Sequence, residues 1–399
     1  MKVYILTGES FPNGMAAVSR IKSYASAIKE GGVEVEILIY RRTEAYGCDI
    51  RNINIFGNYN GVPYHYIPNT TLRSRFRLIR FVYDKCDQRK AGNYLKRMLK
   101  KGDVLFFYMA GRADLILRYM NIAHKCGVFC VHDLCELPYG AGIETENTIK
   151  MRKFSLSQVF PLFDGVVSIS DTLMELAKQY TKPSCLHIKV PILVDFNQFY
   201  LADKSVKAQV PYIFHAGTLY QQKDGILGMI EAFGKAKQRI NFPIKYILTG
   251  ELSASSHPDK LKALIRRYQL EDSVEFVGYL YRDQIIKYLQ SASLVISNRP
   301  KSQQDYYGFS TKVGEYLASG TPLLTTNWGE AMNWLEDGKS AYIVEPENTD
   351  ALADAIVQVF NNMDESRKIG LAGQEVCRKC FDYRNWSKPL VEFLNQLDK

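Results

Sequence analysis

The chain has 399 residues, of which 46% are hydrophobic and 23% charged, which is the balance of a globular protein and not of a disordered one. A net charge of +9 favours an anionic partner such as phosphate groups, nucleic acid or an acidic membrane surface, without choosing among them. No run approaches the roughly 20 apolar residues of a membrane-spanning helix.

The chain's cysteines and first residues indicate its compartment. The run MKVYILTGES is too short in apolar residues for a secretory signal. The eight cysteines are scattered, as is typical of a reducing compartment, so we expect a cytoplasmic protein. Cys126, Cys130, His132 and Cys135 could be written as a zinc set. However, Cys130 and His132 share one apolar strand, and structural zinc usually uses knuckles such as C-x2-C, so buried thiols are the preferred interpretation.

The first forty residues predict a strand, a loop, a helix and a second strand. Residues 2–7 and 33–40 are strand-like, and residues 16–32 have helical periodicity with two glycines at the end. Such a unit begins a doubly wound sheet. The loop GESFPNG lacks a G-x-G-x-x-G fingerprint, so a nicotinamide cofactor is not expected.

Residues 73–101 are helical in tendency and strongly basic, with eleven Lys or Arg against two Asp. Aromatic and apolar residues are interleaved with the charges. One interpretation is a solvated surface helix. The other is a face that rests on an anionic membrane surface. No nucleic-acid motif accompanies the charges, so nucleic acid is not expected as a partner.

The alternation of strands and helices continues to the C-terminus and predicts two α/β domains. Strands are predicted at 103–110, 128–134 and 165–170, and a helix at 171–180 has Asp171 as its expected N-cap. A polar stretch suggests a linker, and a second alternating set follows it. We therefore predict domains at 1–195 and 211–375, a linker at 196–210 and a C-terminal helical segment at 376–399.

Residues 306–326, YYGFSTKVGEYLASGTPLLTT, predict a loop, a helix and a strand. Ser310 or Thr311 could cap the helix, and Gly320 would end it. A hydroxyl-rich helix start with Lys312 suits a phosphate, and Glu315, one turn later, could accept hydrogen bonds from two sugar hydroxyls. An ordinary α/β unit with a solvated Lys–Glu pair is the alternative.

Five segments together resemble the retaining family-4 glycosyltransferases of the GT-B fold. FPNG before a helix is similar to that family's N-terminal glycine loop, and VVSISDTLMELA resembles its "vi.vS..l...l" segment. VPILVDFNQF is similar to P-N-G-V-D-x-x-x-F, and GTLYQQKDGILGMIEAF to G-R-L-x-x-x-K-G…L-I-x-A-F. Residues 306–326 resemble the E-x7-E region and its E-Y-x-A-x-G-x-P sequel. The order and spacing of these segments extend over most of the chain.

The resemblance implies an α/β protein with two Rossmann-like domains facing across a cleft, the first on the acceptor side and the second holding a donor nucleotide. It also implies that the last helix crosses back to the first domain. Lys223 would stabilise the leaving diphosphate without a metal or other cofactor, and His132 would lie near the reacting sugar. The positions implied for donor nucleotide and diphosphate are Gly14, Gly217, Thr218, Lys223, Gly278, Tyr279, Leu280, Arg299, Ser310, Thr311, Lys312 and Glu315. Those implied for the donor sugar are Asp305, Tyr307, Gly308 and Phe309.

Two positions depart from the family pattern. Tyr307 stands where the first Glu of E-x7-E would fall, and Thr218 stands in place of an arginine. Asp305 could reach the sugar instead, and Arg299 could supply a second positive charge. The departures leave the donor sugar, and to a lesser degree the activity, open.

From these observations we predict a retaining glycosyltransferase that acts in surface-polysaccharide or glycan assembly. Its donor would be a UDP- or GDP-sugar, and its acceptor a glycan or lipid-linked molecule at the inner face of a membrane. The alternatives are a sugar-nucleotide epimerase or hydrolase, and a catalytically silent nucleotide-binding subunit that supports a partner enzyme.

Overall fold

The computed structural model describes residues 1–47, 50–109, 111–140, 144–200 and 209–398, which divide into two compact units. Unit 1 contains Met1–Leu193 and Tyr383–Lys399, and unit 2 contains Val194–Asp382. Most of the predicted linker, residues 201–208, lies outside the described residues. Each unit has its own sheet and its own hydrophobic core.

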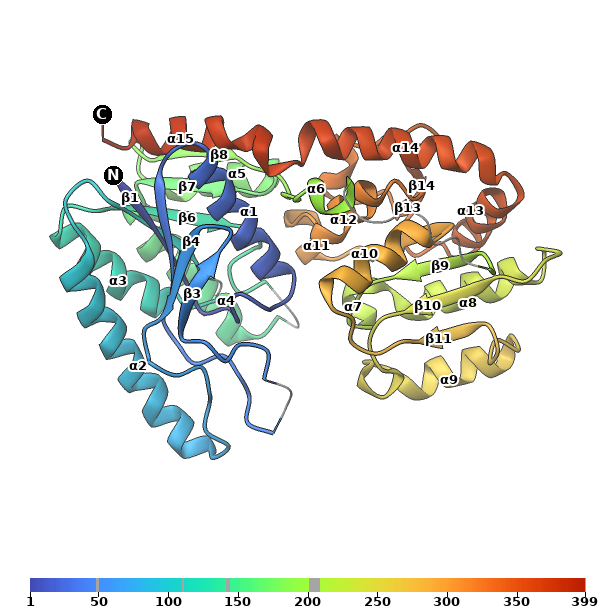
Figure 1. Ribbon diagram of the computed structural model, residues 1–399, viewed down its shortest axis with the longest axis horizontal. Helices are drawn as coiled ribbons and strands as arrows, with labels where there is room; N and C mark the ends of the chain where they lie inside the picture. The colour runs from blue at the N-terminus through green and yellow to red at the C-terminus, as the bar shows by residue number, and fades with distance from the viewer. Residues whose placement is uncertain (48–49, 110, 141–143, 201–208, 399) are drawn as a thin grey trace. The chain divides into compact units, whose positions relative to one another are not determined.

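The sheet of unit 1 has eight strands in the order β3-β4-β2-β1-β5-β6-β7-β8 (Figure 1). All neighbours are parallel except β3 and β4, which form an antiparallel hairpin. The strands are β1 (Lys2–Thr7), β2 (Glu34–Ile39), β3 (Phe56–Tyr59), β4 (Val62–Tyr66), β5 (Val104–Tyr108), β6 (Phe129–Leu134), β7 (Gly165–Ser168) and β8 (Leu186–Lys189). The hairpin was not predicted from the sequence, because its strands are short and β3 alternates between exposed and half-buried residues.

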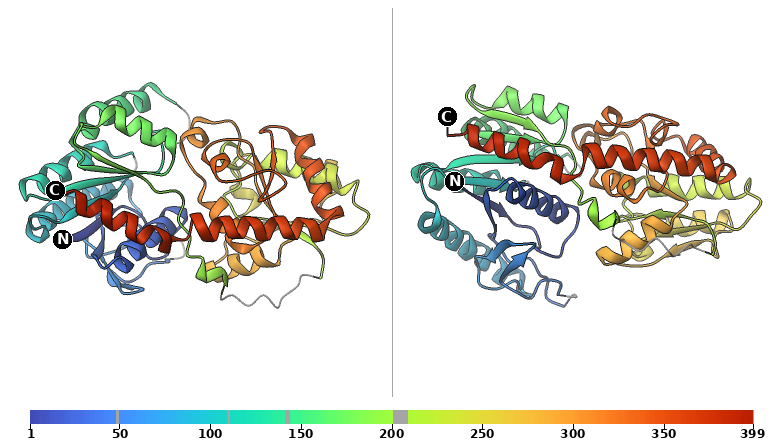
Figure 2. Two further views of the ribbon diagram at one scale, coloured as in Figure 1. Left: turned by 90° about the horizontal axis from the view of Figure 1, so that it is seen from above. Right: turned by 45° about the horizontal axis from the view of Figure 1, so that its top comes forward.

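The helices of unit 1 cover its sheet. They are α1 (Ala16–Glu30), α2 (Arg77–Met98), α3 (Ala113–Lys125), α4 (Glu146–Phe154), α5 (Asp171–Tyr180) and α15 (Ser387–Gln396), with short turns η1 (Ser155–Val159), η2 (Phe160–Leu162) and η5 (Tyr383–Trp386). The last helix, α15, lies along α1 (Figures 1 and 2). Ile21 and Ile28 of α1 share a core with Leu390 and Leu394 of α15, so burial of these apolar side chains fixes the C-terminal helix to unit 1.

The sheet of unit 2 has six parallel strands in the order β11-β10-β9-β12-β13-β14. They are β9 (Tyr212–His215), β10 (Lys245–Leu248), β11 (Val274–Phe276), β12 (Leu294–Ser297), β13 (Leu323–Thr326) and β14 (Tyr342–Val344). All four residues of each of β9, β12 and β13 are buried, as expected for central parallel strands with helices on both faces.

The helices of unit 2 form two layers. They are α6 (Asn197–Tyr200), α7 (Gln221–Asp224), α8 (Ile226–Lys237), α9 (Pro258–Arg267), α10 (Arg282–Ser291), α11 (Gln303–Tyr307), α12 (Thr311–Ser319), α13 (Thr349–Asn361) and α14 (Met363–Cys380), with turns η3 (Leu252–Ala254) and η4 (Glu330–Asn333). The apolar faces of α8, α9 and α13 share one core. Helix α12 contacts α10 and α14 instead, and it follows β12 and the short helix α11 in the chain.

One predicted helix cap is wrong. Helix α5 begins at Asp171, but the cap is Ser170, whose Oγ accepts a hydrogen bond from the Leu173 amide at 3.2 Å. Ser170 has the extended backbone of an N-cap, whereas Asp171 already lies in the first turn. There its carboxylate favours the helix through the dipole rather than through a cap.

Candidate functional site

Each sheet has a point at which the strand order reverses. In unit 2 the chain runs from β9 to β10 and β11 on one side, then returns to β12 on the other. The loops that leave β9 and β12 therefore diverge, and ligands of open α/β sheets usually bind in the crevice at such a point. The corresponding point in unit 1 lies between β1 and β5.

The loop after β9 is held by two hydrogen bonds to Thr249, the residue that follows β10. The Gly217 amide donates to Thr249 Oγ1 at 2.8 Å, and the Thr249 hydroxyl donates back to the Gly217 carbonyl at 3.1 Å. Leu219 is fully buried at a φ of 56°, in the left-handed region that costs a non-glycine residue about 1 kcal/mol. Such local strain is common at functional sites. Lys223 follows in α7 with an exposed side chain.

Asp224, the next residue, is buried among cations. Its carboxylate forms a close ion pair with Lys312, and lies 3.8 Å from Arg299 Nη1 and 3.9 Å from His215 Nε2. Burial alone would raise the pKa of Asp224, but the charge of Lys312 and the interaction with His215 outweigh it and hold the pKa well below its usual value. Burial lowers the pKa of Lys312, and Asp224 opposes that effect.

Gly217 lies so close to this cluster that a larger residue there would displace its side chains. A Cβ at position 217 would be 2.4 Å from His215 Nε2, 2.6 Å from Lys312 Nζ and 3.1 Å from Asp224 Oδ2. The loop after β9 and the first turn of α12 are therefore in direct contact, although the sequence separates them by about ninety residues.

Three further predicted residues have partners inside unit 2. Arg299 Nε donates to Asp305 Oδ1 at 2.6 Å, and the Ser302 hydroxyl donates to Asp305 Oδ2 at 2.7 Å. Arg282 Nη1 donates to Glu315 Oε1 at 2.6 Å. Both carboxylates are thus engaged in this state, and their predicted contacts with a donor stay predictions.

The other predicted positions of unit 2 lie on the same loops. Gly278 follows β11 with a φ of 69°, and its carbonyl accepts from the Gly250 amide at 2.7 Å. Tyr279 is exposed and meets Tyr281 edge-to-face, with ring centroids 5.5 Å apart. Leu280 and Phe309 are buried, and Thr218, Tyr307, Gly308 and Thr311 are half-buried. Ser310 occupies the N-cap position of α12 but makes no side-chain cap.

In unit 1 the loop after β1 is tightly braced. A Cβ at Gly14 would lie 2.4 Å from Val18 Cγ2 and 2.7 Å from the Ser10 carbonyl, so the loop requires glycine there. The buried Glu44 accepts from the Ser10 hydroxyl at 3.0 Å and from Asn52 Nδ2 at 2.8 Å. These bonds fix the shape of the glycine loop.

His132 lies in β6 with 6% of its surface exposed. Its ring stacks on Phe163 with centroids 4.8 Å apart and planes 3° from parallel. Burial lowers its pKa to about 4, so the imidazole is neutral near pH 7. Nδ1 has no hydrogen-bond partner among the described residues. The neighbouring Asp133 pairs with the buried Arg20 at 3.0 Å.

The cysteine set weighed for zinc is not gathered in the structure. Within the described ranges, the ligand atoms that lie within 4.8 Å of one another belong to His124, Cys130 and Asp164. Asp164 is already paired with Lys182 Nζ at 2.6 Å, and this ammonium opposes a cation there.

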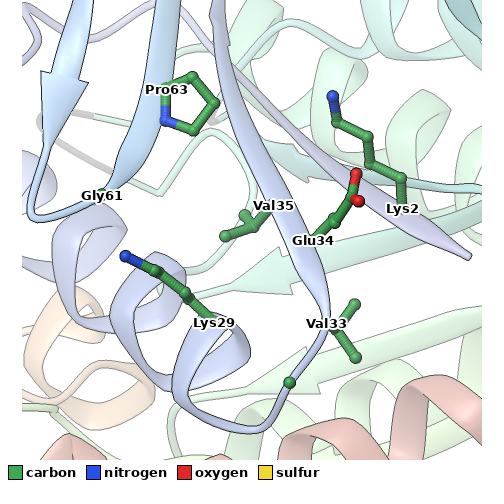
Figure 3. A pocket seen from close by; sticks show the side chains of 8 residues that line it. Lys2, Lys29, Val33, Glu34, Val35, Gly61 and Pro63 are labelled. Atoms are coloured by element: carbon green, nitrogen blue, oxygen red, sulfur yellow. The ribbon is translucent and has the colours of Figure 1, made fainter.

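A hollow of about 370 Å³ opens in unit 1 at the amino ends of its strands (Figure 3). Its lining residues are Lys2, Lys29, Gly32, Val33, Glu34, Val35, Gly61 and Pro63. None of the predicted site residues lines it. Ligands of parallel sheets bind at the opposite, carboxyl edge, so this hollow is not the candidate site.

Residues 198–376 match the family described as glycosyl transferases group 1. A curated relative, the D-inositol 3-phosphate glycosyltransferase of Corynebacterium urealyticum, is 26% identical over 162 residues, which are 39% of this chain and 36% of the relative. The MMP alpha-(1->4)-mannosyltransferase of Mycolicibacterium hassiacum is 25% identical over 239 residues, 59% of this chain and 54% of the relative. The matches thus span about half or less of these relatives' length.

Solved glycosyltransferase structures extend the likeness to the whole chain. The sucrose-phosphate synthase of Thermosynechococcus elongatus has a TM-score of 0.76 at 16% identity, over 100% of this chain and 99% of that one. Anabaena Alr3699/HepE, in complex with UDP-glucose, has a TM-score of 0.70 at 15% identity, over 99% and 100%. The predicted GT-B fold of two Rossmann-like domains is confirmed.

The site in unit 2 combines predicted and unpredicted residues. Of the predicted residues, Gly217, Arg299 and Lys312 lie around Asp224, and Lys223 is the residue before it. His215, Asp224, Asn298 and Arg282 were missed, because their roles depend on partners far away in the sequence. The Lys–Asp sequence at 223–224, where the family pattern has Lys–Gly, was the one visible signal.

Proposed function

We propose that the protein transfers a sugar from a nucleoside diphosphate sugar to an acceptor hydroxyl, with retention of the anomeric configuration. The observation that carries this proposal is the convergence of two lysines at the switch point of unit 2. Lys223 comes from α7, which follows the loop after β9, and Lys312 comes from the first turn of α12. Lys223 is near enough to lower the pKa of Lys312 further. Cations at a helix start form a site for a diphosphate.

The chemistry that these residues support is electrostatic. As the bond from the anomeric carbon to the diphosphate oxygen breaks, negative charge grows on the leaving group, and the exposed Lys223 ammonium can stabilise it without a metal. The acceptor oxygen bonds to the same face of the anomeric carbon, and its proton passes to the leaving phosphate oxygen. Glu315 lies on the next turn of α12, where its carboxylate could exchange Arg282 for ribose hydroxyls.

His132 would take a supporting part in unit 1. Its neutral imidazole can donate a hydrogen bond to a sugar hydroxyl or accept one from it. Because its pKa is lowered, it adds no charge near pH 7. The braced glycine loop after β1 offers backbone groups at the other switch point.

We propose a UDP-sugar as the donor, since HepE, which has the same fold, was crystallised with UDP and UDP-glucose; a GDP-sugar is the alternative. A thermal-shift screen with UDP, GDP, ADP and CMP tests this. At 100 times its Kd, a nucleotide that binds only the folded state adds about 2.7 kcal/mol of stability. UDP should raise the melting temperature most. The absence of a shift with all four would contradict a nucleotide-sugar site.

We further propose that the basic helix α2 rests on an anionic membrane surface and brings the protein to a lipid-linked acceptor. The part of α2 before Asp87 can make this contact, because it contains no buried residues. The second half of α2 is the packed part, since Asp87, Gln88, Ala91, Gly92 and Leu95 are its buried residues. Leu78 is 83% exposed and Phe81 64%. The large apolar residues that are exposed at the start of α2 and just before it, which we call the apolar tip, are Leu72, Phe76, Leu78, Ile79, Phe81, Val82 and Tyr83.

No helix in the described ranges is long and apolar enough to span a bilayer, so binding would occur at the surface. Apolar side chains entering the interface and basic ones on lipid phosphates both contribute to such binding. We expect the protein to sediment with vesicles containing acidic phosphatidylglycerol at low salt. Replacing Phe76, Leu78 and Phe81 with serine should weaken this binding at least about tenfold.

The matched control for the apolar tip is Leu371→Ser, which changes an exposed leucine of α14 in unit 2. It should leave vesicle binding unchanged. If the unaltered protein ignores acidic vesicles at low salt, the membrane proposal is wrong, and α2 is a solvated surface helix.

A further inference from the structure

Asp224 is a buried carboxylate in the middle of the proposed diphosphate site. It has 2% of its surface exposed, and nothing in the chemistry proposed above requires an anion there. A carboxylate beside a phosphate site opposes phosphate binding by charge alone. Its presence therefore requires another explanation.

The backbone next to Asp224 is held by the residue that follows β12. Gly225 follows with a φ of 57°, and a Cβ there would lie 2.3 Å from Asn298 Nδ2. The Asn298 amide donates to the Gly225 carbonyl at 3.0 Å, and Asn298 directly follows β12. The two switch-point loops are thus joined just behind Asp224, which fixes where its carboxylate lies.

The carboxylate in turn fixes Lys312. The lysine side chain is 22% exposed and extends toward Gly217, whose Cβ position is 2.6 Å from Nζ. Arg299 Nη1 is within 3.8 Å of the same carboxylate, and Lys223 is near enough to affect Lys312. Without Asp224, these like charges would drive the flexible lysine away from the loop. An ammonium has three N–H donors, so Lys312 can bind Asp224 and a phosphate oxygen together.

We propose that Asp224 is a positioning residue that holds Lys312 against the loop after β9 as a second diphosphate-binding cation beside Lys223. Thr218 of this loop carries no charge, so α12 supplies the second cation. This inference rests on the proposed nucleotide-sugar function. It differs from a purely structural ion pair, because such a pair can often be replaced by neutral residues of similar shape without loss of function.

The decisive variant is Asp224→Asn, which keeps the shape of the side chain and adds one net positive charge to the site. If Asp224 merely competed with phosphate, this variant would bind UDP more tightly. A positioning role predicts weaker binding, by about tenfold for the loss of one well-placed charged hydrogen bond. Calorimetry with UDP measures the dissociation constant. Binding that is unchanged or tighter overturns the inference.

Lys312→Met and the double variant Asp224→Asn/Lys312→Met complete the test. Lys312→Met leaves a buried carboxylate without its cation and should lower the melting temperature by several degrees. The double variant removes both charges, so its melting temperature should recover, whereas UDP binding should stay at least about tenfold weak. Its affinity should also fall less steeply with salt than that of the unaltered protein, because one phosphate contact is lost.

The outcomes separate the two proposals. If the unaltered protein binds none of UDP, GDP, ADP and CMP, the proposed function is wrong and this inference with it. If it binds UDP and the well-folded double variant binds UDP equally well, only the role of Asp224 and Lys312 is wrong. Should Asp224→Asn fail to fold, the double variant decides alone.

Discussion

Replacing Lys223 with methionine is expected to lower the rate of sugar transfer about a hundredfold or more. A well-placed charge in a catalytic site contributes about 3 kcal/mol to transition-state stabilisation, and each 1.4 kcal/mol is about tenfold in rate. Lys223 is exposed and forms no ion pair with the described residues, so the melting temperature should not change. The measurement is the release of UDP from a UDP-sugar in the presence of acceptor.

The control is Lys287→Met, which changes an exposed lysine of α10 and should leave turnover unaltered. The Lys223 variant also distinguishes an enzyme from a catalytically silent subunit. The silent subunit was considered because Tyr307 and Thr218 replace the Glu and Arg of the family pattern. If a reconstituted system transfers sugar equally well with the unaltered protein and with Lys223→Met, a partner enzyme performs the catalysis and this chain only supports it.

Unit 1 is expected to lose about 3 kcal/mol of unfolding free energy between pH 6.5 and pH 4. His132 is buried and its pKa is lowered to about 4, whereas an unfolded histidine has a pKa of about 6.5. Below pH 6.5 the unfolded chain therefore binds a proton that the folded chain does not, and stability falls as the pH falls. Well above pH 6.5, His132 is neutral in both the folded and the unfolded chain, so it no longer lowers the free energy of unfolding.

Urea unfolding of unit 1 at several pH values measures this effect. Trp386 lies in unit 1, and the other two tryptophans, Trp328 and Trp334, lie in unit 2, so replacing those two with phenylalanine makes the fluorescence specific. His132→Phe keeps an aromatic ring against Phe163 and should flatten the pH dependence in this window. An unchanged pH dependence in that variant would assign it to another group.

Much of the fold could be predicted from periodicity. The alternation of strands and helices gave both parallel sheets, and the apolar stripe of α1 is buried as its spacing required. The hairpin of β3 and β4 was missed because its strands are only four and five residues long and β3 buries none of its side chains fully. The C-terminal helix was expected beside the first domain from the family resemblance, and it shares a core with α1 through residues such as Ile28 and Leu390 that lie far apart in the chain.

The site was predictable by position but not by pairing. Glycines, Lys223 and the α12 helix start could be named, because each has a local pattern. The partner of Lys312 could not, since Asp224 is 88 residues away, and neither could the partner of Glu315, since Arg282 is 33 residues away. From the sequence, Lys312 and Glu315 could have formed a solvated pair with each other. In the structure, each pairs with a residue of another helix instead.

Retaining sugar transfer by this chain is tested most directly by the configuration of the sugar first released from a UDP-sugar. The donor is the α-configured UDP-sugar that gives the largest thermal shift, with water as the acceptor, and proton NMR is recorded before the free sugar mutarotates. Retaining transfer predicts that the α-anomer and UDP are produced first, and that Lys223→Met suppresses both. A product that is first β would contradict retention, and a bound donor that never releases UDP, even with a glycan or lipid-linked acceptor, would contradict glycosyl transfer by this chain.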